Sequence, residues 1–70
     1  MRYREIAKKL QSLGCEELLR RSGGSHRKWH NPQNGRIVPI PDWGRKDLKM
    51  GTIRAIVRQL ELDWDEFSKA

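Results

Sequence analysis

The chain has 70 residues, with 15 Lys and Arg against 9 Asp and Glu, for a formal net charge of +6. Apolar residues make up 36% of the sequence, enough for one small core, so we expect one domain over residues 1–70 without a deep cofactor cavity. The single cysteine excludes an internal disulfide framework.

No apolar segment approaches the roughly 20 residues that span a bilayer. Charge begins at Arg2, so we expect neither a membrane anchor nor a signal peptide. Cys15, His26 and His30 do not have the spacing of a zinc site. These features predict a cytoplasmic protein with no bound metal and no small-molecule cofactor.

Positive charge is concentrated in the middle of the chain. Residues 20–58 hold ten basic and two acidic side chains, a net charge of +8, whereas residues 59–70 have a net charge of −3. A basic segment within a folded domain usually has a polyanionic partner, most often nucleic acid. The alternative is a solvated face that keeps the protein soluble.

The first element in the chain is a predicted amphipathic helix. Tyr3, Ile6, Leu10 and Leu13 recur at spacings of three and four, and Gly14 follows as a C-terminal cap. Residues 15–21 are ambiguous, because Glu and Leu there favour a helix, and a short strand is the competing interpretation. We expect a strand.

A hairpin follows a turn at residues 22–24. Residues 25–30 alternate as in a strand, with His26, Lys28 and His30 on one side. Residues 31–35 contain Asn-Gly and predict a turn, and residues 36–41 form the return strand. Pro39 lacks an N–H, which indicates an edge strand.

Two helices complete the predicted order. Residues 42–49 read as a charged loop, and a second amphipathic helix carries Ile53, Ile56, Val57 and Leu60, with Thr52 as a candidate cap. Residues 62–67 predict a short last helix capped by Asp63. Helices that bracket an antiparallel hairpin imply an α+β two-layer sandwich with helices on one face of the sheet.

His26 is the candidate catalytic residue. Imidazole takes and returns protons near neutral pH, and RNA offers a 2′-hydroxyl beside each phosphate. The preceding Gly24 and Ser25 belong to a turn in which glycine allows close approach of the backbone to a ligand. Mg²⁺ would need a carboxylate cluster that the sequence lacks. The competing interpretation of a lone strand histidine is a surface or packing residue.

Other residues have two interpretations each. His30 is either a partner acid for His26 or an ordinary residue before the turn, and Trp43 either stacks on a base or closes the core. Lys46 and Lys49 precede a helix N-terminus, where they would seat a phosphate unless they are merely solvated. The candidate contacts to an RNA strand on the hairpin are Arg27, Lys28 and Arg36.

Two motifs in order, Gly24-Ser25-His26 and the segment 44–54, carry a resemblance over nearly the whole chain. The segment is similar to Gly-Lys-Asp-Leu-Lys-x-Gly-Thr-Leu-Arg, and the helix end at Leu13-Gly14 and the hairpin at residues 31–39 also match. The chain thereby resembles the HicA family of small toxins from type II toxin–antitoxin systems.

The resemblance implies a double-stranded-RNA-binding-domain-like fold and an mRNA-cleaving ribonuclease without a metal ion. It implies that His26 is the catalytic histidine, and that a HicB-like antitoxin covers the active surface. The RNA-binding residues then comprise Gly24, Ser25, Arg27, Lys28, Arg36, Lys46, Lys49 and Thr52. The rival hypotheses are a non-catalytic RNA-binding module of the same fold and a pure protein-interaction domain.

Overall fold

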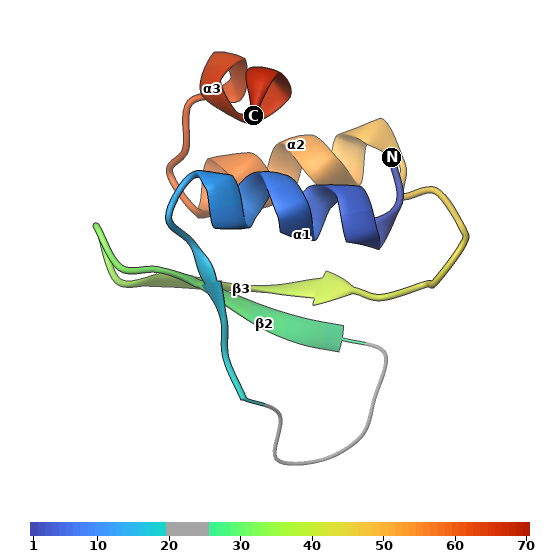
Figure 1. Cartoon of the computed structure of the whole chain (residues 1–70), viewed down its shortest axis with the longest axis horizontal. Coiled ribbons are helices and arrows are strands. Elements are labelled where there is room, and N and C mark those ends of the chain that lie inside the picture. The colour runs from blue at the N-terminus through green and yellow to red at the C-terminus, as the bar shows by residue number, and fades with distance from the viewer. Residues whose placement is uncertain (20–25) are drawn as a thin grey trace.

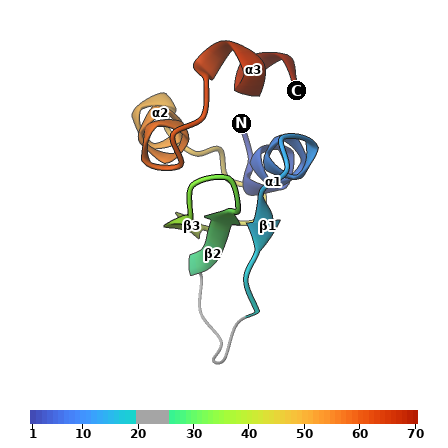
Figure 2. The same ribbon diagram turned by 90° about the vertical axis from the view of Figure 1, so that its left-hand side faces the viewer.

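The computed structural model describes residues 1–19 and 26–70 as an α+β fold. The element order is α1 (Tyr3–Ser12), β1 (Glu16–Glu17), β2 (His26–Asn31), β3 (Arg36–Pro41), α2 (Met50–Gln59) and α3 (Trp64–Lys69). The strands form an antiparallel sheet in the order β1-β2-β3. Figures 1 and 2 show α1 and α2 against one face of this sheet and α3 above the two helices. This order confirms the expected fold class.

The first helix forms because its apolar positions share one face. Tyr3, Ile6 and Leu10 are buried, and the Glu5 carboxylate accepts the backbone N–H of Arg2 at 3.2 Å, which satisfies an orphan donor at the start of the helix. Gly14 has a φ of +89°, and its N–H donates to the carbonyl of Gln11. The predicted glycine cap is therefore confirmed, in a conformation that L side chains rarely adopt.

The first strand is shorter than predicted. Only Glu16–Glu17 pairs with β2 in the described part, although the N–H of Leu18 still donates to the carbonyl of Lys28 at 2.8 Å. Residues 20 and 21 of the predicted strand lie outside the described residues. Cys15 lies just before the strand and is buried, as expected of a small apolar residue, and burial raises the pKa of its thiol.

The hairpin matches its prediction closely. β3 spans residues 36–41 as expected and lies at an edge of the described sheet. Pro39 lies opposite Lys28, and at an edge its missing N–H costs no hydrogen bond to a further strand. Asn31 ends β2 and is 2% exposed, although it was expected in the turn. Its amide donates to the carbonyl of Leu60 at 2.9 Å and its oxygen accepts the N–H of Gln33, so the hairpin is tied to the end of α2.

The second helix begins earlier than predicted. Lys49 is its N-cap residue and Thr52 lies within its first turn, so the expected capping role of Thr52 is wrong. No side-chain hydrogen bond caps this end of α2 in the structure. The turn before Ile53 is already helical, because the N–H of the buried Ile53 donates to the carbonyl of Lys49 at 3.1 Å.

The third helix closes the core on top of the first two. Phe67 is fully buried, and Asp63 is the N-cap residue as predicted, without a capping hydrogen bond from its side chain. The ammonium of Lys9 in α1 lies 3.0 Å from the carbonyl of Ser68 and 3.1 Å from that of Ala70. A cation at the carbonyl end of a helix is favourable, so Lys9 fastens α3 to α1.

The helices of this fold are too short or too polar to span a membrane. Within residues 1–19 and 26–70, none of them has both the length and the apolarity that a bilayer span requires.

Candidate nucleic-acid interface

The alternation of β2 divides its side chains between the two faces of the sheet. Trp29 and Asn31 are buried toward the helices, whereas His26 and Lys28 are exposed and His30 is partly exposed on the opposite face. No described helix or strand covers that second face, as the end-on view in Figure 2 shows. We call this surface the open face.

The open face is completed by the two neighbouring strands. His26, Lys28 and His30 lie opposite Pro41, Pro39 and Ile37 of β3, and His30 lies opposite Glu16 of β1. Ile37 is 54% exposed there. The result is a strip of two imidazoles and one ammonium along the central strand, bordered by short apolar side chains and one carboxylate.

His30 has a defined partner on this face. Its Nδ1 lies 3.2 Å from Oε1 of Glu16, and the side chains of the two residues are 26% and 63% exposed. The pairing follows from the register of β1 against β2, which places the two residues side by side. The sequence contained no local signal for it, because Glu16 and His30 are fourteen positions apart.

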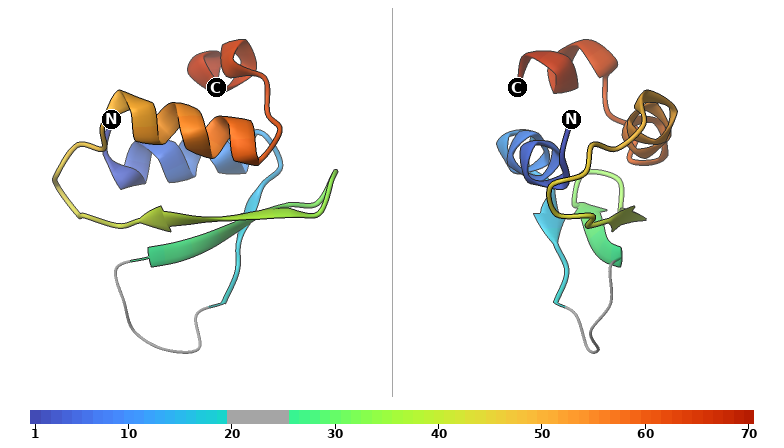
Figure 3. Two further views of the ribbon diagram at one scale, coloured as in Figure 1. Left: turned by 180° about the vertical axis from the view of Figure 1, so that it is seen from behind. Right: turned by 90° about the vertical axis from the view of Figure 1, so that its right-hand side faces the viewer.

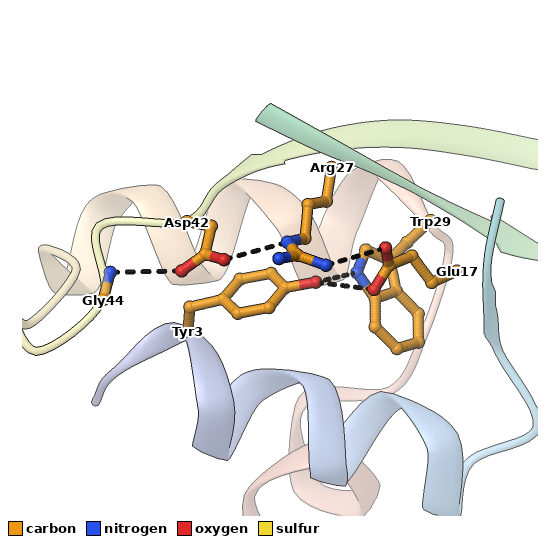
Figure 4. Close-up of polar contacts among 6 residues, drawn as sticks. All are labelled: Tyr3, Glu17, Arg27, Trp29, Asp42 and Gly44. Carbon is orange, nitrogen blue, oxygen red and sulfur yellow. Dashed lines mark hydrogen bonds and ion pairs between the residues drawn. The ribbon is translucent and has the colours of Figure 1, made fainter. Parts of the chain in front are cut away.

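Arg27 faces the helices and belongs to a polar network behind the sheet, which Figure 4 shows. Its Nε lies 2.8 Å from Oδ2 of Asp42, and its Nη1 lies 3.2 Å from Oε2 of Glu17. The hydrogen bond to Glu17, and after it that to Asp42, raises the pKa of Arg27. The other oxygen of Asp42 accepts the N–H of Gly44 at 3.1 Å, which connects the network to the loop after β3.

Tyr3 continues this network into the core. Its hydroxyl donates to Oε1 of Glu17 at 3.1 Å and accepts a hydrogen bond from Nε1 of Trp29 at 3.0 Å. The guanidinium of Arg27 lies 5.5 Å from the centre of the Tyr3 ring, within the range of a cation–π contact. Burial is the main cause that raises the pKa of Tyr3 to about 12.

The basic loop lies at the end of the sheet where β2 begins. β3 ends there at Pro41, opposite His26, and residues 42–49 then climb to the start of α2, as Figures 1 and 3 show. The loop carries Lys46 and Lys49, both exposed, and is held by the buried Leu48, whose N–H donates to the carbonyl of Met1 at 2.9 Å. The segment that leaves Pro41, opposite His26, therefore carries both lysines, and Thr52 lies in the first turn of the helix that follows it.

Arg36 lies at the opposite end of the sheet. It begins β3 opposite Asn31, five residues before Pro41, which corresponds to about 17 Å along an extended strand. Its Nε lies 2.8 Å from Oε2 of Glu61, an exposed carboxylate after α2. Arg36, which the sequence predicts on the hairpin with Arg27 and Lys28, thus lies at the end of the sheet away from the basic loop.

Two of the predicted RNA contacts, Gly24 and Ser25, lie outside the described residues. His26 is therefore the described part of the Gly24-Ser25-His26 motif. Trp43 is 45% exposed, between the two interpretations given above. Within the described ranges, no group of three or more His, Cys, Asp or Glu side chains is arranged to hold a metal ion.

Sequence reasoning missed the carboxylates that partner the basic residues. Glu17 and Asp42 bind Arg27, and Glu16 contacts His30, yet each lies ten or more positions from its partner. The only signal in the sequence is the alternation of side chains along β2. This alternation places Arg27 on the same face as Trp29, away from His26.

Comparison with known families gives one match. The family model described as the HicA toxin of bacterial toxin–antitoxin systems matches residues 3–62, from the first residue of α1 to the segment after α2. No curated protein and no solved structure shows a significant match. The likeness to a double-stranded-RNA-binding domain therefore stays a prediction, whereas the α-β-β-β-α-α order is observed.

Proposed function

Because the chain belongs to the HicA family of toxins from bacterial toxin–antitoxin systems, we propose that it is an endoribonuclease that cleaves mRNA and so blocks translation. The observation that carries the proposal is the position of His26 on the open face, at the end of the sheet where the basic loop lies. A proton acceptor and a set of cations at one exposed edge suit a flexible polyanion better than a small ligand.

His26 is the general base of the proposed reaction. Its imidazole takes the proton of a ribose 2′-hydroxyl, and the 2′-oxygen attacks the adjacent phosphorus. Exposure of His26 on a sheet face gives a single strand with a splayed nucleotide direct access to it. Replacement of a positioned general base typically lowers the rate by about 10²- to 10⁴-fold.

We assign the contacts with RNA phosphates to Lys28, Lys46 and Lys49. Lys28 shares the open face with it, and Lys46 and Lys49 precede the start of α2, where unpaired N–H groups add partial positive charge. Thr52 in the first turn adds a hydroxyl donor beside them. Gly24 and Ser25 remain predicted contacts through the backbone before His26.

The two arginines of the hairpin take different roles from those first expected. The guanidinium of Arg27 is bound by two carboxylates on the helix side, so we assign it to holding β2 and residues 42–44 together. Arg36 lies a strand length from His26 and contacts an RNA strand only if that strand follows the whole hairpin. Neither residue is required at the cleaved phosphate.

An antitoxin partner follows from the family. We expect a HicB-like protein to bind over the open face and the basic loop in the cytoplasm, because covering His26 and its cations blocks RNA directly. An acidic surface on that partner would match the net charge of +8 in residues 20–58.

The test is incubation of the purified protein with a labelled mRNA in EDTA, beside the His26→Ala variant. Cleavage by the wild type and at least a 100-fold slower reaction for the variant are expected. Equal cleavage by both proteins would show that another residue or a contaminant is responsible. Lys69→Ala, a change in α3 away from the sheet, serves as the purification control.

RNA binding measured on the same two proteins distinguishes the rival hypothesis of a non-catalytic RNA-binding module. It would bind the same RNA with strong salt dependence in both the wild type and the His26→Ala variant, and would cleave it in neither. A pure protein-interaction domain would show no salt-dependent RNA affinity.

A further inference from the structure

His30 is the second imidazole of the open face, and its surroundings differ from those of an ordinary residue before a turn. Glu16 of β1 faces it on one side, with Oε1 at 3.2 Å from Nδ1, and the apolar Ile37 of β3 lies opposite on the other side. Lys28 lies two residues earlier on the same face of the strand. The described helices pack on the opposite face of the sheet (Figure 2).

The contact with Glu16 orients the ring. A carboxylate at Nδ1 accepts a hydrogen bond from that nitrogen and holds the imidazole in one orientation. Because Nδ1 is engaged, Nε2 is the nitrogen that can present a proton to a ligand on the open face. This arrangement of an acid oriented by a third group recurs in proton-transfer sites.

The spacing along β2 gives the oriented ring a place in the reaction. His26 and His30 are four residues apart on one face, so their Cα atoms are separated by about 13 Å, with Lys28 midway. Two imidazoles that reach inward from such positions flank a phosphodiester, and an ammonium between them meets its non-bridging oxygens. A base, a cation and an acid thus follow one another along a single strand.

We propose that His30, oriented by Glu16, is the general acid that protonates the 5′-oxygen as it leaves. The proposal rests on the proposed ribonuclease function. In this step the 2′-oxygen–phosphorus bond forms as the 2′-hydroxyl proton passes to His26, and the phosphorus–5′-oxygen bond breaks as the proton of His30 passes to that oxygen. The products are a 2′,3′-cyclic phosphate and a 5′-hydroxyl end, and the two histidines exchange protonation states. Glu16 is a positioning residue, since it acts through His30.

The test compares two RNA substrates of the same sequence, made around a site that the wild-type protein is first shown to cleave. One has the natural 5′-bridging oxygen, and the other has sulfur at that single position. A thiolate leaves without protonation, because a thiol is a far stronger acid than the ribose alcohol that leaves from the natural substrate. Rates are measured for wild type, His30→Ala, His26→Ala and Glu16→Gln.

The expected result for His30→Ala is a loss of about 100-fold or more with the oxygen substrate and a rate within a few-fold of wild type with the sulfur substrate. Glu16→Gln should show the same pattern with a smaller loss. His26→Ala should stay slow on both substrates, because its role lies with the nucleophile. Ile37→Ala, opposite His30, is the matched control, and any loss it causes should be equal for both substrates.

Other outcomes overturn the proposal separately from the ribonuclease function. Equal losses of His30→Ala on both substrates would assign His30 to structure or binding, and an unchanged rate on the oxygen substrate would remove it from the reaction. Failure of the wild type to cleave any RNA would instead refute the proposed function itself. If the melting temperature shows that His30→Ala is unfolded, His30→Gln carries the same comparison.

Discussion

The hydroxyl of Tyr3 accepts a 3.0 Å hydrogen bond from the indole Nε1 of Trp29, which joins the first turn of α1 to the central strand of the sheet. The same hydroxyl donates to Glu17, whose second oxygen binds Arg27. Core packing and the ion pairs behind the open face are therefore one continuous structure. A substitution of Trp29 in the core should therefore disturb the ion pair of Arg27, and a substitution of Arg27 should disturb the packing around Trp29.

Alkaline pH should destabilise the protein through Tyr3, the single tyrosine of the chain. Its pKa is about 12 in the folded protein and about 10 when unfolded. Between these values the unfolded state has lost the proton that the folded state keeps, so the free energy of unfolding falls as pH rises. The expected loss is about 2–3 kcal/mol by pH 12.

Ultraviolet absorbance of the tyrosinate measures this ionisation directly. A midpoint well above 10 is expected for the native protein and a midpoint near 10 in denaturant. Denaturant unfolding of Tyr3→Phe, which retains every lysine, should lack the additional decline between pH 10 and 12. A native midpoint near 10 would contradict the prediction.

Loss of Arg27 should loosen the basic loop before it unfolds the protein. Arg27→Met keeps most of the side-chain stem but leaves Asp42 without its cation, and Asp42 holds the N–H of Gly44. Trypsin should then cleave after Arg45 or Lys46 several-fold faster than in the wild type, because local opening of the loop costs less free energy.

Arg36→Met is the matched control for that experiment. It also removes one arginine ion pair of 2.8 Å, but the pair is exposed and at the opposite end of the sheet. Its effect on trypsin cleavage of the loop should be small. Similar acceleration by the two variants would mean that general stability, and not the contact with Asp42, governs the loop.

Two glycine substitutions should change stability in opposite directions. Gly14→Ala places a side chain at a φ of +89° and should cost about 1–2 kcal/mol, although space for the methyl group is open. Gly51 lies in α2, where alanine meets no atom within 4 Å, so Gly51→Ala should stabilise by about 0.5 kcal/mol. Thermal unfolding should show the two opposite shifts, of about 4–8 °C per kcal/mol. A loss of stability in both variants would refute the conformational explanation.

Removal of charge from the basic loop should weaken RNA binding in a salt-dependent way. In the His26→Ala background, which we expect not to cleave, Lys46→Gln with Lys49→Gln should reduce the slope of log affinity against log salt by about 1.4 for a single strand. The measurement is RNA affinity across a salt series. Lys69→Gln in α3 removes the same kind of charge and should leave most of the slope intact. An unchanged slope in the double variant would exclude the loop from the interface.

Local patterns in the sequence predicted α1 with its Gly14 cap, the hairpin with its edge strand, and the side of β2 that His26, Lys28 and His30 share. These features depend on periodicity and turn chemistry within a few residues. The start of α2 was placed too late, because the choice between Lys49 and Thr52 as the cap residue depended on packing and not on capping preference.

Only the tertiary structure decided which groups meet. The short β1 has no periodic pattern, yet its register brings Glu16 to His30 and Glu17 to Arg27. The course of the chain after β3 brings Asp42 to the other side of Arg27 and separates Arg36 from the basic loop. Charge and hydrophobic period are properties of the sequence itself, whereas ion pairs between distant residues exist only after strand pairing and packing have brought them within reach.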